Sequence, residues 1–245
     1  MINVTIWDEF RHEKTNAEAK ALYPDGIHAY IKGFLDTNED MNVRLAALDD
    51  EFQGLPDDVL NDTDVLIWWG HMAHGEVDDE LVTRIRDRVY LGKMSFIALH
   101  SAHHSKPFKA IVGTNGNLSW GRNQKEVVWN MLPAHEITAG IPEHFTLSEE
   151  ELYSEPFYIP QPDELVFCSW FEDGNVFRSG ATFYRGAGKV FYFQPGHETC
   201  PSYHNKYVQR IITNAVRWAK PNEIAYDITN DCPQIKTKVT DEFEK

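Results

Sequence analysis

Two apolar segments of the sequence lead directly into histidines. The segment GKVFYFQPGHE ends in His197 and Glu198, and the segment MSFIALHSAHH places His100 directly after its apolar run. Each apolar run has the length and composition of a buried strand. Because open α/β sheets bind ligands at the carboxyl ends of their strands, we expect both histidine groups to line one site at that edge.

Imidazole and carboxylate groups could supply two kinds of chemistry at such a site. Neutral imidazole moves protons near neutral pH and is a common ligand of zinc. His197 could therefore act as a general base, a metal ligand or a hydrogen-bond donor, with Glu198 orienting it. The candidate catalytic residues are His197, Glu198 and His103. The candidate ligands of a divalent metal, zinc in particular, are His12, His71, His103 and His197.

Several of these histidines also have ordinary structural explanations. His71 and His74 follow the apolar run VLIWW, so they could bind a metal, donate to a ligand hydroxyl, or cap the next helix. The charged run WDEFRHEK, which contains His12, could equally be a solvated face of the protein. Either His103 or His104 could face the site, while at least one histidine of their cluster is expected to be an ordinary surface or packing residue.

Composition and charge narrow the class of partner. The chain has 245 residues, 42% of them hydrophobic, which suffices for a globular core. Its 38 acidic residues outnumber 23 basic ones, giving a net charge of −15. This charge repels phosphate backbones and anionic membranes, so we expect neither nucleic acid nor a membrane as partner. No apolar run could span a bilayer, and the first residues lack the pattern of a secretory signal.

The three cysteines lie far apart in the sequence, at Cys168, Cys200 and Cys232. Their odd number and the absence of CxxC spacing argue against a disulfide framework and against a thiolate zinc site. We therefore expect a cytoplasmic protein, because thiols stay reduced in that compartment.

Strand and helix patterns alternate along the chain, which predicts βαβ units and a parallel sheet. The expected strands are 2–8, 41–48, 65–69, 94–99, 165–171, 176–184 and 189–194. The expected helices are 56–61, 78–90 and 203–219, with a helical region at 16–36 that is interrupted near Pro24. The polar stretch 101–164 is expected to form long loops. We expect a single domain over residues 1–220 and a C-terminal extension over 221–245.

Four segments together resemble one known family. FIALHSAHH resembles the strand and sharp turn that carry the nucleophilic cysteine of class I glutamine amidotransferases, and VFYFQPGHE resembles their segment with the catalytic His and Glu. With DVLIWWGHMAHGEV and EELYSEPF, the chain resembles a ThuA-like trehalose-utilisation protein of that superfamily. The resemblance implies an α/β, flavodoxin-like three-layer fold. Its sheet would be mostly parallel, with an antiparallel portion near residues 165–194.

The resemblance also implies a function, with one departure from the superfamily. His100 stands where the cysteine would be, so we do not expect glutamine hydrolysis. The implied function is carbohydrate utilisation, acting on trehalose or a keto-derivative of it as a sugar isomerase, lyase or hydrolase. The alternatives are a non-catalytic sugar-binding or regulatory subunit, and a structural subunit that supports a partner enzyme.

The small-molecule carbohydrate would meet several side chains near the sheet edge. The candidate substrate-binding residues are Trp69, His71, His104, Glu151 and Tyr153. For Tyr153 the alternative is core packing, and for Glu151 it is a solvated acid. We expect no nucleotide cofactor. We expect a homo-oligomer on general grounds, because symmetric homo-oligomers are common.

Overall fold

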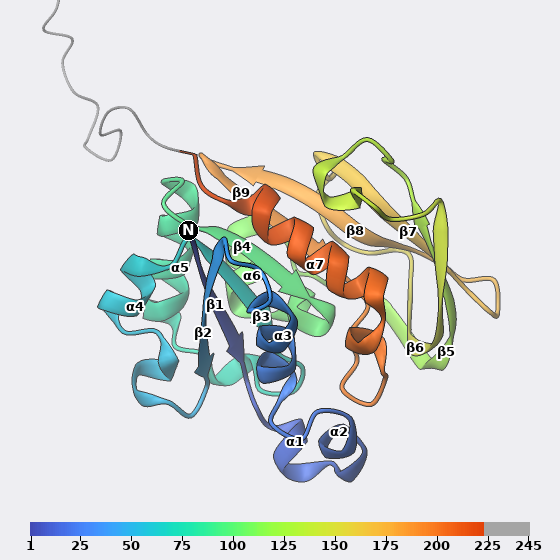
Figure 1. The fold of residues 1–245 in the computed structure, drawn as a ribbon, viewed down its shortest axis with the longest axis horizontal. Coiled ribbons are helices and arrows are strands. Elements are labelled where there is room, and N and C mark those ends of the chain that lie inside the picture. Colours follow the sequence, from blue (N-terminus) through green and yellow to red (C-terminus); the bar gives the residue numbers. More distant parts are fainter. Residues whose placement is uncertain (223–245) are drawn as a thin grey trace, which may run out of the picture.

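The computed structural model describes residues 1–222, so the expected extension from residue 223 onward lies outside the described residues. A single nine-stranded mixed sheet runs through this part of the chain in the order β2-β1-β3-β4-β9-β8-β7-β5-β6. Figure 1 shows the N-terminal strands at one end of this sheet and β5 to β8 at the other. The predicted α/β class is confirmed.

The parallel half of the sheet consists of the strands that the sequence predicted. They are β1 (Ile2–Asp8), β2 (Met41–Ala47), β3 (Val65–Trp69), β4 (Ser95–Leu99) and β9 (Gly188–Phe193). Every residue of β3 and β4 is buried, as expected for strands covered on both faces. Continuous apolar runs therefore identified these strands correctly.

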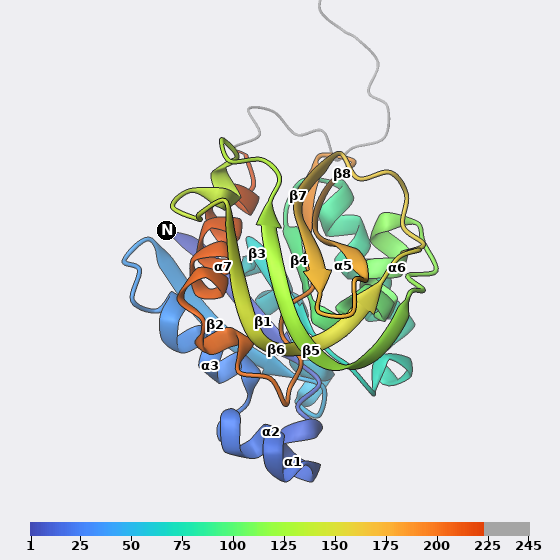
Figure 2. The same ribbon diagram turned by 90° about the vertical axis from the view of Figure 1, so that its right-hand side faces the viewer.

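The antiparallel half extends further than predicted. It contains β5 (Ser119–Asn130), β6 (His144–Ser154), β7 (Glu164–Phe171) and β8 (Val176–Arg185). Figure 2 shows β5 and β6 as long curved strands that run side by side. The prediction of loops over 101–164 is therefore wrong for 119–130 and 144–154. Both strands are partly exposed and rich in polar residues, and β5 is bulged near Gly121, so the apolar periodicity of a strand is weak there.

Helices cover both faces of the sheet, which gives three layers. On one face, α3 (Ile27–Leu35) and α7 (Lys206–Ala219) pack their apolar sides against the strands, in front of the sheet in Figure 1. The other face is covered by α4 (Asp57–Asp62), α5 (Asp79–Tyr90) and α6 (Lys106–Val112). The Asp78 side chain caps α5 by accepting a hydrogen bond from the Glu80 N–H.

Short helical turns occupy the loops at the carboxyl edge. They are α1 (His12–Thr15), α2 (Ala17–Leu22), η1 (Glu51–Gly54), η2 (His74–Glu76), η3 (His100–His104) and η5 (Ser202–His204). One further turn, η4 (Glu136–Thr138), lies at the opposite edge in the loop between β5 and β6. The last expected helix, 203–219, divides into η5 and α7 because Asn205 caps α7 by accepting from the Tyr207 N–H. No helix in residues 1–222 is long and apolar enough to cross a membrane.

Candidate functional site

The carboxyl ends of four adjacent strands form one row. Asp8 of β1 lies opposite Trp69 of β3, which lies opposite Leu99 of β4, which lies opposite Phe193 of β9. The loops that follow these strands must therefore leave the sheet side by side. The loops carry His12, His71, His100 and His197.

Three of these histidines meet a carboxylate from the antiparallel half of the sheet. His71, His100, Glu151 and His197 each offer one nitrogen or oxygen atom, and these four atoms lie within 4.8 Å of one another. We call these four residues the His–Glu cluster. Glu151 comes from β6, a strand that the sequence did not predict, although Glu151 was itself a candidate.

His100 has an unusual backbone at the end of β4. Its φ of 52° lies in the left-handed region, which non-glycine residues rarely adopt. The buried ring is held by a contact from Nδ1 to the Gln194 carbonyl at 3.0 Å and from Nε2 to Glu151 Oε2 at 3.1 Å. Burial opposes protonation of His100, but the hydrogen bond and charge of Glu151 outweigh it and raise the pKa. The sharp turn predicted from the amidotransferase resemblance is therefore present, with an imidazole in place of a thiol.

Glu198 joins the His–Glu cluster to one further histidine, His12. Its Oε2 lies 3.0 Å from His71 Nδ1, and its Oε1 lies 3.2 Å from His12 Nδ1 and 3.5 Å from His197 Nε2. Burial favours the neutral acid, but the hydrogen bond from His71 and the other imidazoles outweigh burial and lower the pKa of Glu198 to about 2. A buried carboxylate thus orients three imidazoles at once.

A second buried carboxylate, Glu150, holds the loop that carries His197. It accepts hydrogen bonds from the N–H groups of Glu151 at 2.8 Å, Gly196 at 2.7 Å and His197 at 3.1 Å, and from the Ser202 hydroxyl. Gly196 itself has φ of 142°, and a Cβ there would come within 2.1 Å of the Tyr203 hydroxyl. Only glycine therefore fits directly before His197.

The charged run after β1 is also buried, so its interpretation as a solvated face is wrong for its acidic residues. Glu9 accepts from the N–H groups of Met72 at 2.8 Å and Ala73 at 2.9 Å, and thereby fixes the loop after His71. Glu13 accepts from the Ile27 N–H at 2.9 Å. The loops leave these backbone N–H groups without a backbone acceptor. Because buried N–H groups need acceptors, the acids are buried beside them.

The His–Glu cluster forms part of the wall of a cavity of about 550 Å³. The cavity is lined by His71, His74, Ser101, His103, His104, Asn117, Leu118, Trp120, Glu151, Tyr153 and His197. This volume lies within the range of sites for small molecules. Tyr153 stacks on His100 with ring centres 5.1 Å apart, and its hydroxyl contacts Ser101 Oγ at 2.7 Å.

Burial keeps most of the imidazoles in this region neutral. It lowers the pKa of His197 to about 4 and that of His74 to about 3. It also lowers the pKa values of His12 and His104, and holds that of His103 well below the ordinary range. His103 Nδ1 lies 2.6 Å from the Gly116 carbonyl, so Nδ1 carries the proton and Nε2 is left as an acceptor.

The structure brings most of the candidate residues together and gives each a place. The cavity is lined by His71, His103, His104, Glu151, Tyr153 and His197. Two others lie behind its wall: Glu198 holds the imidazoles, and His12 stacks on His71 with ring centres 5.0 Å apart. Trp69 is fully buried, and its Nε1 donates to the Gly196 carbonyl at 3.0 Å, so it supports the His197 loop.

Sequence reasoning did not select three residues that the structure places at the site. His100 was treated mainly as the substitute for a cysteine, yet it is the most buried member of the His–Glu cluster. Glu150 and Trp120 lie on β6 and β5, where loops were expected. The run of three acids Glu149–Glu151, followed by the apolar Leu152 and Tyr153, was the one available signal, because acids that become buried need partners.

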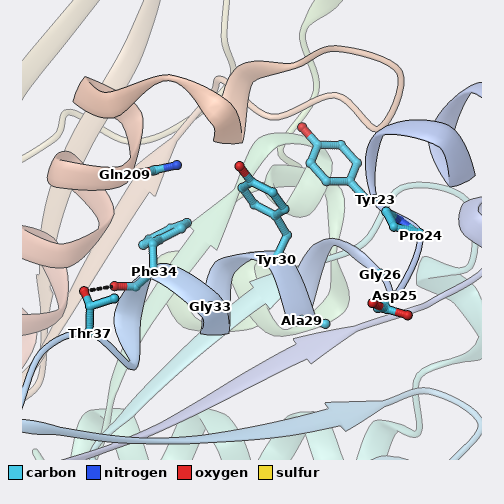
Figure 3. A pocket seen from close by; sticks show the side chains of 10 residues that line it. All are labelled: Tyr23, Pro24, Asp25, Gly26, Ala29, Tyr30, Gly33, Phe34, Thr37 and Gln209. Atoms are coloured by element: carbon cyan, nitrogen blue, oxygen red, sulfur yellow. Dashed lines mark hydrogen bonds between the residues drawn. The ribbon is translucent and has the colours of Figure 1, made fainter.

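A second cavity, of about 490 Å³, lies between α3 and α7 and is shown in Figure 3. Its walls include the rings of Tyr30 and Phe34. Its polar groups bond within the protein: Gln209 donates to the Tyr203 carbonyl at 2.9 Å, and Thr37 donates to the Phe34 carbonyl at 2.8 Å. This cavity contains no cluster of titratable groups, so it is not the candidate site.

The fold and the site define an α/β protein with a histidine–carboxylate site at the carboxyl edge of its sheet. The sequence profile of the ThuA family, described as trehalose utilisation, matches residues 3–219, and the chain therefore belongs to the ThuA family. The predicted family is confirmed. Comparison with curated protein sequences finds no match.

Solved structures of low identity share the fold. A ThuA-like protein from Parabacteroides merdae superposes with a TM-score of 0.68 at 14% identity, covering 96% of each chain. A ThuA-like protein from Bacteroides uniformis gives 0.62 at 15% identity, covering 89% of this chain and 91% of that one. A cytoplasmic protein from Salmonella typhimurium gives 0.59 at 11% identity, covering 89% and 100%. At these identities the likeness supports the fold alone.

Proposed function

We propose that this protein is an enzyme of carbohydrate utilisation that acts on trehalose or a keto-derivative of it, without glutaminase activity. The observation that carries the proposal is the His–Glu cluster, in which His71, His197 and Glu151 line the 550 Å³ cavity and the buried His100 lies directly behind them. The family profile, described as trehalose utilisation, supplies the class of substrate.

The donor set fits a divalent metal such as zinc. Nδ1 of His71 contacts Glu198 and Nδ1 of His100 contacts the Gln194 carbonyl, so Nε2 is the remaining nitrogen of each ring. Zinc-binding histidines commonly donate their other nitrogen to such oxygens. With Glu151, these two residues would complete the three protein ligands of many catalytic zinc sites. A bound metal would polarise a sugar carbonyl or hydroxyl as a Lewis acid.

His197 is better placed to donate a hydrogen bond than to bind the metal. Its Nδ1 accepts from the Thr199 N–H at 3.2 Å, so the neutral ring carries its proton on Nε2. This Nε2–H lies 3.5 Å from Glu198 Oε1, and on substrate binding it would donate to the substrate oxygen instead. A neutral imidazole polarises a carbonyl in this way when its pKa is low, as it is for His197.

His103 would accept the proton. Its Nδ1–H is bound to the Gly116 carbonyl, which leaves the Nε2 lone pair as the base. In a keto-sugar this base would remove a proton from the carbon beside the carbonyl while His197 stabilises the developing oxyanion. An isomerisation would be completed when the proton returns to the former carbonyl carbon and the proton of the neighbouring hydroxyl passes to the former carbonyl oxygen. An elimination would be completed when a β-oxygen substituent leaves and takes up the proton that His103 removed.

The experiment is incubation of untagged protein with trehalose and with 3-keto-trehalose, followed by NMR. The expected result is a new sugar product, formed about 10²–10⁴-fold more slowly by His103→Gln, because a general base contributes on that scale. His144→Gln is the control and should not slow product formation, because His144 is exposed and lines neither this cavity nor its neighbour. No product from either sugar would overturn the enzymatic proposal.

A non-catalytic sugar-binding or regulatory role is the second candidate. It is favoured by the low pKa values of the cavity imidazoles, because a group with a pKa near 4 is a weak base at neutral pH. This role predicts saturable binding of trehalose with no product after long incubation.

A further inference from the structure

Trp120 stands at the rim of the 550 Å³ cavity and is 74% exposed. It lies on β5, directly opposite Tyr153 of β6, which borders the His–Glu cluster. An exposed indole leaves a large apolar surface in water, and such surfaces commonly mark binding sites. The exposed ring therefore calls for an explanation other than core packing.

Other exposed tryptophans of the antiparallel half differ from Trp120. Trp129 lies 4.6 Å from the His144 ring, so part of its surface has a partner. Trp170 is 50% exposed but lines none of the cavities described here. Within residues 1–222, Trp120 has no aromatic partner and faces cavities instead.

A second hollow, distinct from the cavity between α3 and α7, lies beside the 550 Å³ cavity. Trp120 lines both the hollow and the 550 Å³ cavity. This hollow has a volume of about 360 Å³ and is lined by Ser119, Trp120, Leu152, Ser154, Glu155 and Asn175. Because the same residue lines both hollows, they are adjacent. The second hollow contains hydroxyl, amide and carboxylate groups but none of the histidines. Its chemistry therefore suits recognition of hydroxyl groups and not proton transfer.

We infer that Trp120 and this second hollow form the subsite for the second ring of the disaccharide, so that Trp120 sets the preference for a two-ring sugar over a monosaccharide. The inference rests on the proposed function, in which the first ring occupies the histidine-lined cavity. A pyranose ring has an apolar face of C–H groups and a rim of hydroxyls. The apolar face would stack on the indole, and the rim would meet Ser154 and Asn175.

The test compares the binding of trehalose and glucose to the intact protein by calorimetry, with tryptophan fluorescence as a second readout. The wild type is expected to bind trehalose more tightly than glucose. Trp120→Ala is expected to weaken trehalose binding about tenfold, because lost aromatic stacking is on that scale. Because Trp120 stands only at the rim of the first cavity, glucose binding is expected to weaken by much less, so that the preference for trehalose falls. Trp120→Phe should keep most of the preference. Trp170→Ala, equally apolar and also exposed, should leave both affinities unchanged.

The outcomes separate this inference from the proposed function. If Trp120→Ala leaves the ratio of the two affinities as it is in the wild type, the subsite is rejected and the proposed function stands. The same titration is made with 3-keto-trehalose, and if the wild type binds none of the three sugars, both are rejected. Because Trp120 is exposed, its replacement leaves no cavity in the core, and circular dichroism of the variant should match the wild type.

Discussion

Glu198 Oε2 lies 3.0 Å from His71 Nδ1, so residues 127 positions apart are joined at the carboxyl edge of the sheet. The other carboxylate oxygen reaches His12 at 3.2 Å. One buried acid therefore fixes the ring of a cavity-lining histidine and that of the histidine stacked behind it. The orientation of the site depends on this carboxylate, although Glu198 itself does not line the cavity.

Replacing Glu198 with Gln should weaken the site without unfolding the protein. The glutamine amide carries no negative charge and has only one acceptor oxygen, so it cannot hold all three imidazoles. The ring of His71 would therefore lose its fixed orientation. We expect zinc affinity and turnover to fall by about 10–100-fold, the usual effect of losing such an outer partner. Zinc titration and NMR assays would measure both. Glu143→Gln, at an exposed position, is the control and should change neither; an unaltered Glu198→Gln variant would refute the orienting role.

Zinc binding should depend on His71, His100 and Glu151 and not on every cavity histidine. His71→Ala and His100→Ala are each expected to reduce the bound metal of untagged protein from about one equivalent to less than a tenth, because a three-ligand site rarely survives with two. His74→Ala should retain the metal, since His74 lines the cavity outside the cluster. Elemental analysis of each purified protein would measure the bound zinc. If metal-free wild-type protein bound added zinc with only millimolar or weaker affinity, this site would be excluded.

Removing the Glu150 carboxylate should destabilise the fold. Glu150→Ala leaves three N–H donors and the Ser202 hydroxyl without their acceptor in a buried place. We expect the free energy of unfolding to fall by about 3 kcal/mol or more, measured by urea denaturation. Glu149→Ala, one position away and exposed, should cost less than about 0.5 kcal/mol. Similar losses for the two variants would contradict the assigned role of Glu150.

The stability of the protein should fall with rising pH because of Glu13. Burial, helped by the nearby charge of Asp8, raises the pKa of Glu13 to about 7. A folded-state pKa above the unfolded value makes the contribution of this group fully present below the unfolded pKa, and it is lost as pH rises toward about 7. Glu13→Gln should therefore be more stable than the wild type at about pH 8 and not at about pH 4. Thermal unfolding of the two proteins at both pH values would measure this change in their relative stability. An equal difference in stability at the two pH values would contradict the role of Glu13.

The protein should not hydrolyse glutamine. His100 occupies the sharp turn after β4, and an imidazole there contacts Glu151 and the Gln194 carbonyl. Cys168 lies within β7, and the buried Cys200 accepts a hydrogen bond from Tyr23 through its carbonyl. We expect no ammonia release from glutamine, and His100→Cys should not create it without a substrate pocket for the amide. Measurable release by the wild type would contradict this expectation.

The sequence by itself determined the parallel half of the fold and the edge at which the site lies. Continuous apolar runs such as Val65–Trp69 are stable only where other elements cover both faces of the strand. Such a run is recognised from neighbouring residues alone, so it predicts a buried strand reliably. Each run ends in a polar loop, and the row of strand ends then brings His71, His100 and His197 to one place. The motifs that resemble the ThuA family lie at these same strand ends.

Only the tertiary structure decided what completes the site. β5 and β6 are partly exposed and polar, so they lack the local apolar periodicity that predicts a strand. They form because they pair with strands far away in the sequence. Through them the structure supplies Glu151, Glu150 and Trp120. The roles of Glu9, Glu150 and Glu198 likewise depend on backbone and imidazole donors far away in the sequence. From the sequence alone, a carboxylate is expected to be exposed to solvent. Only the tertiary structure shows that it is buried and which donors it contacts.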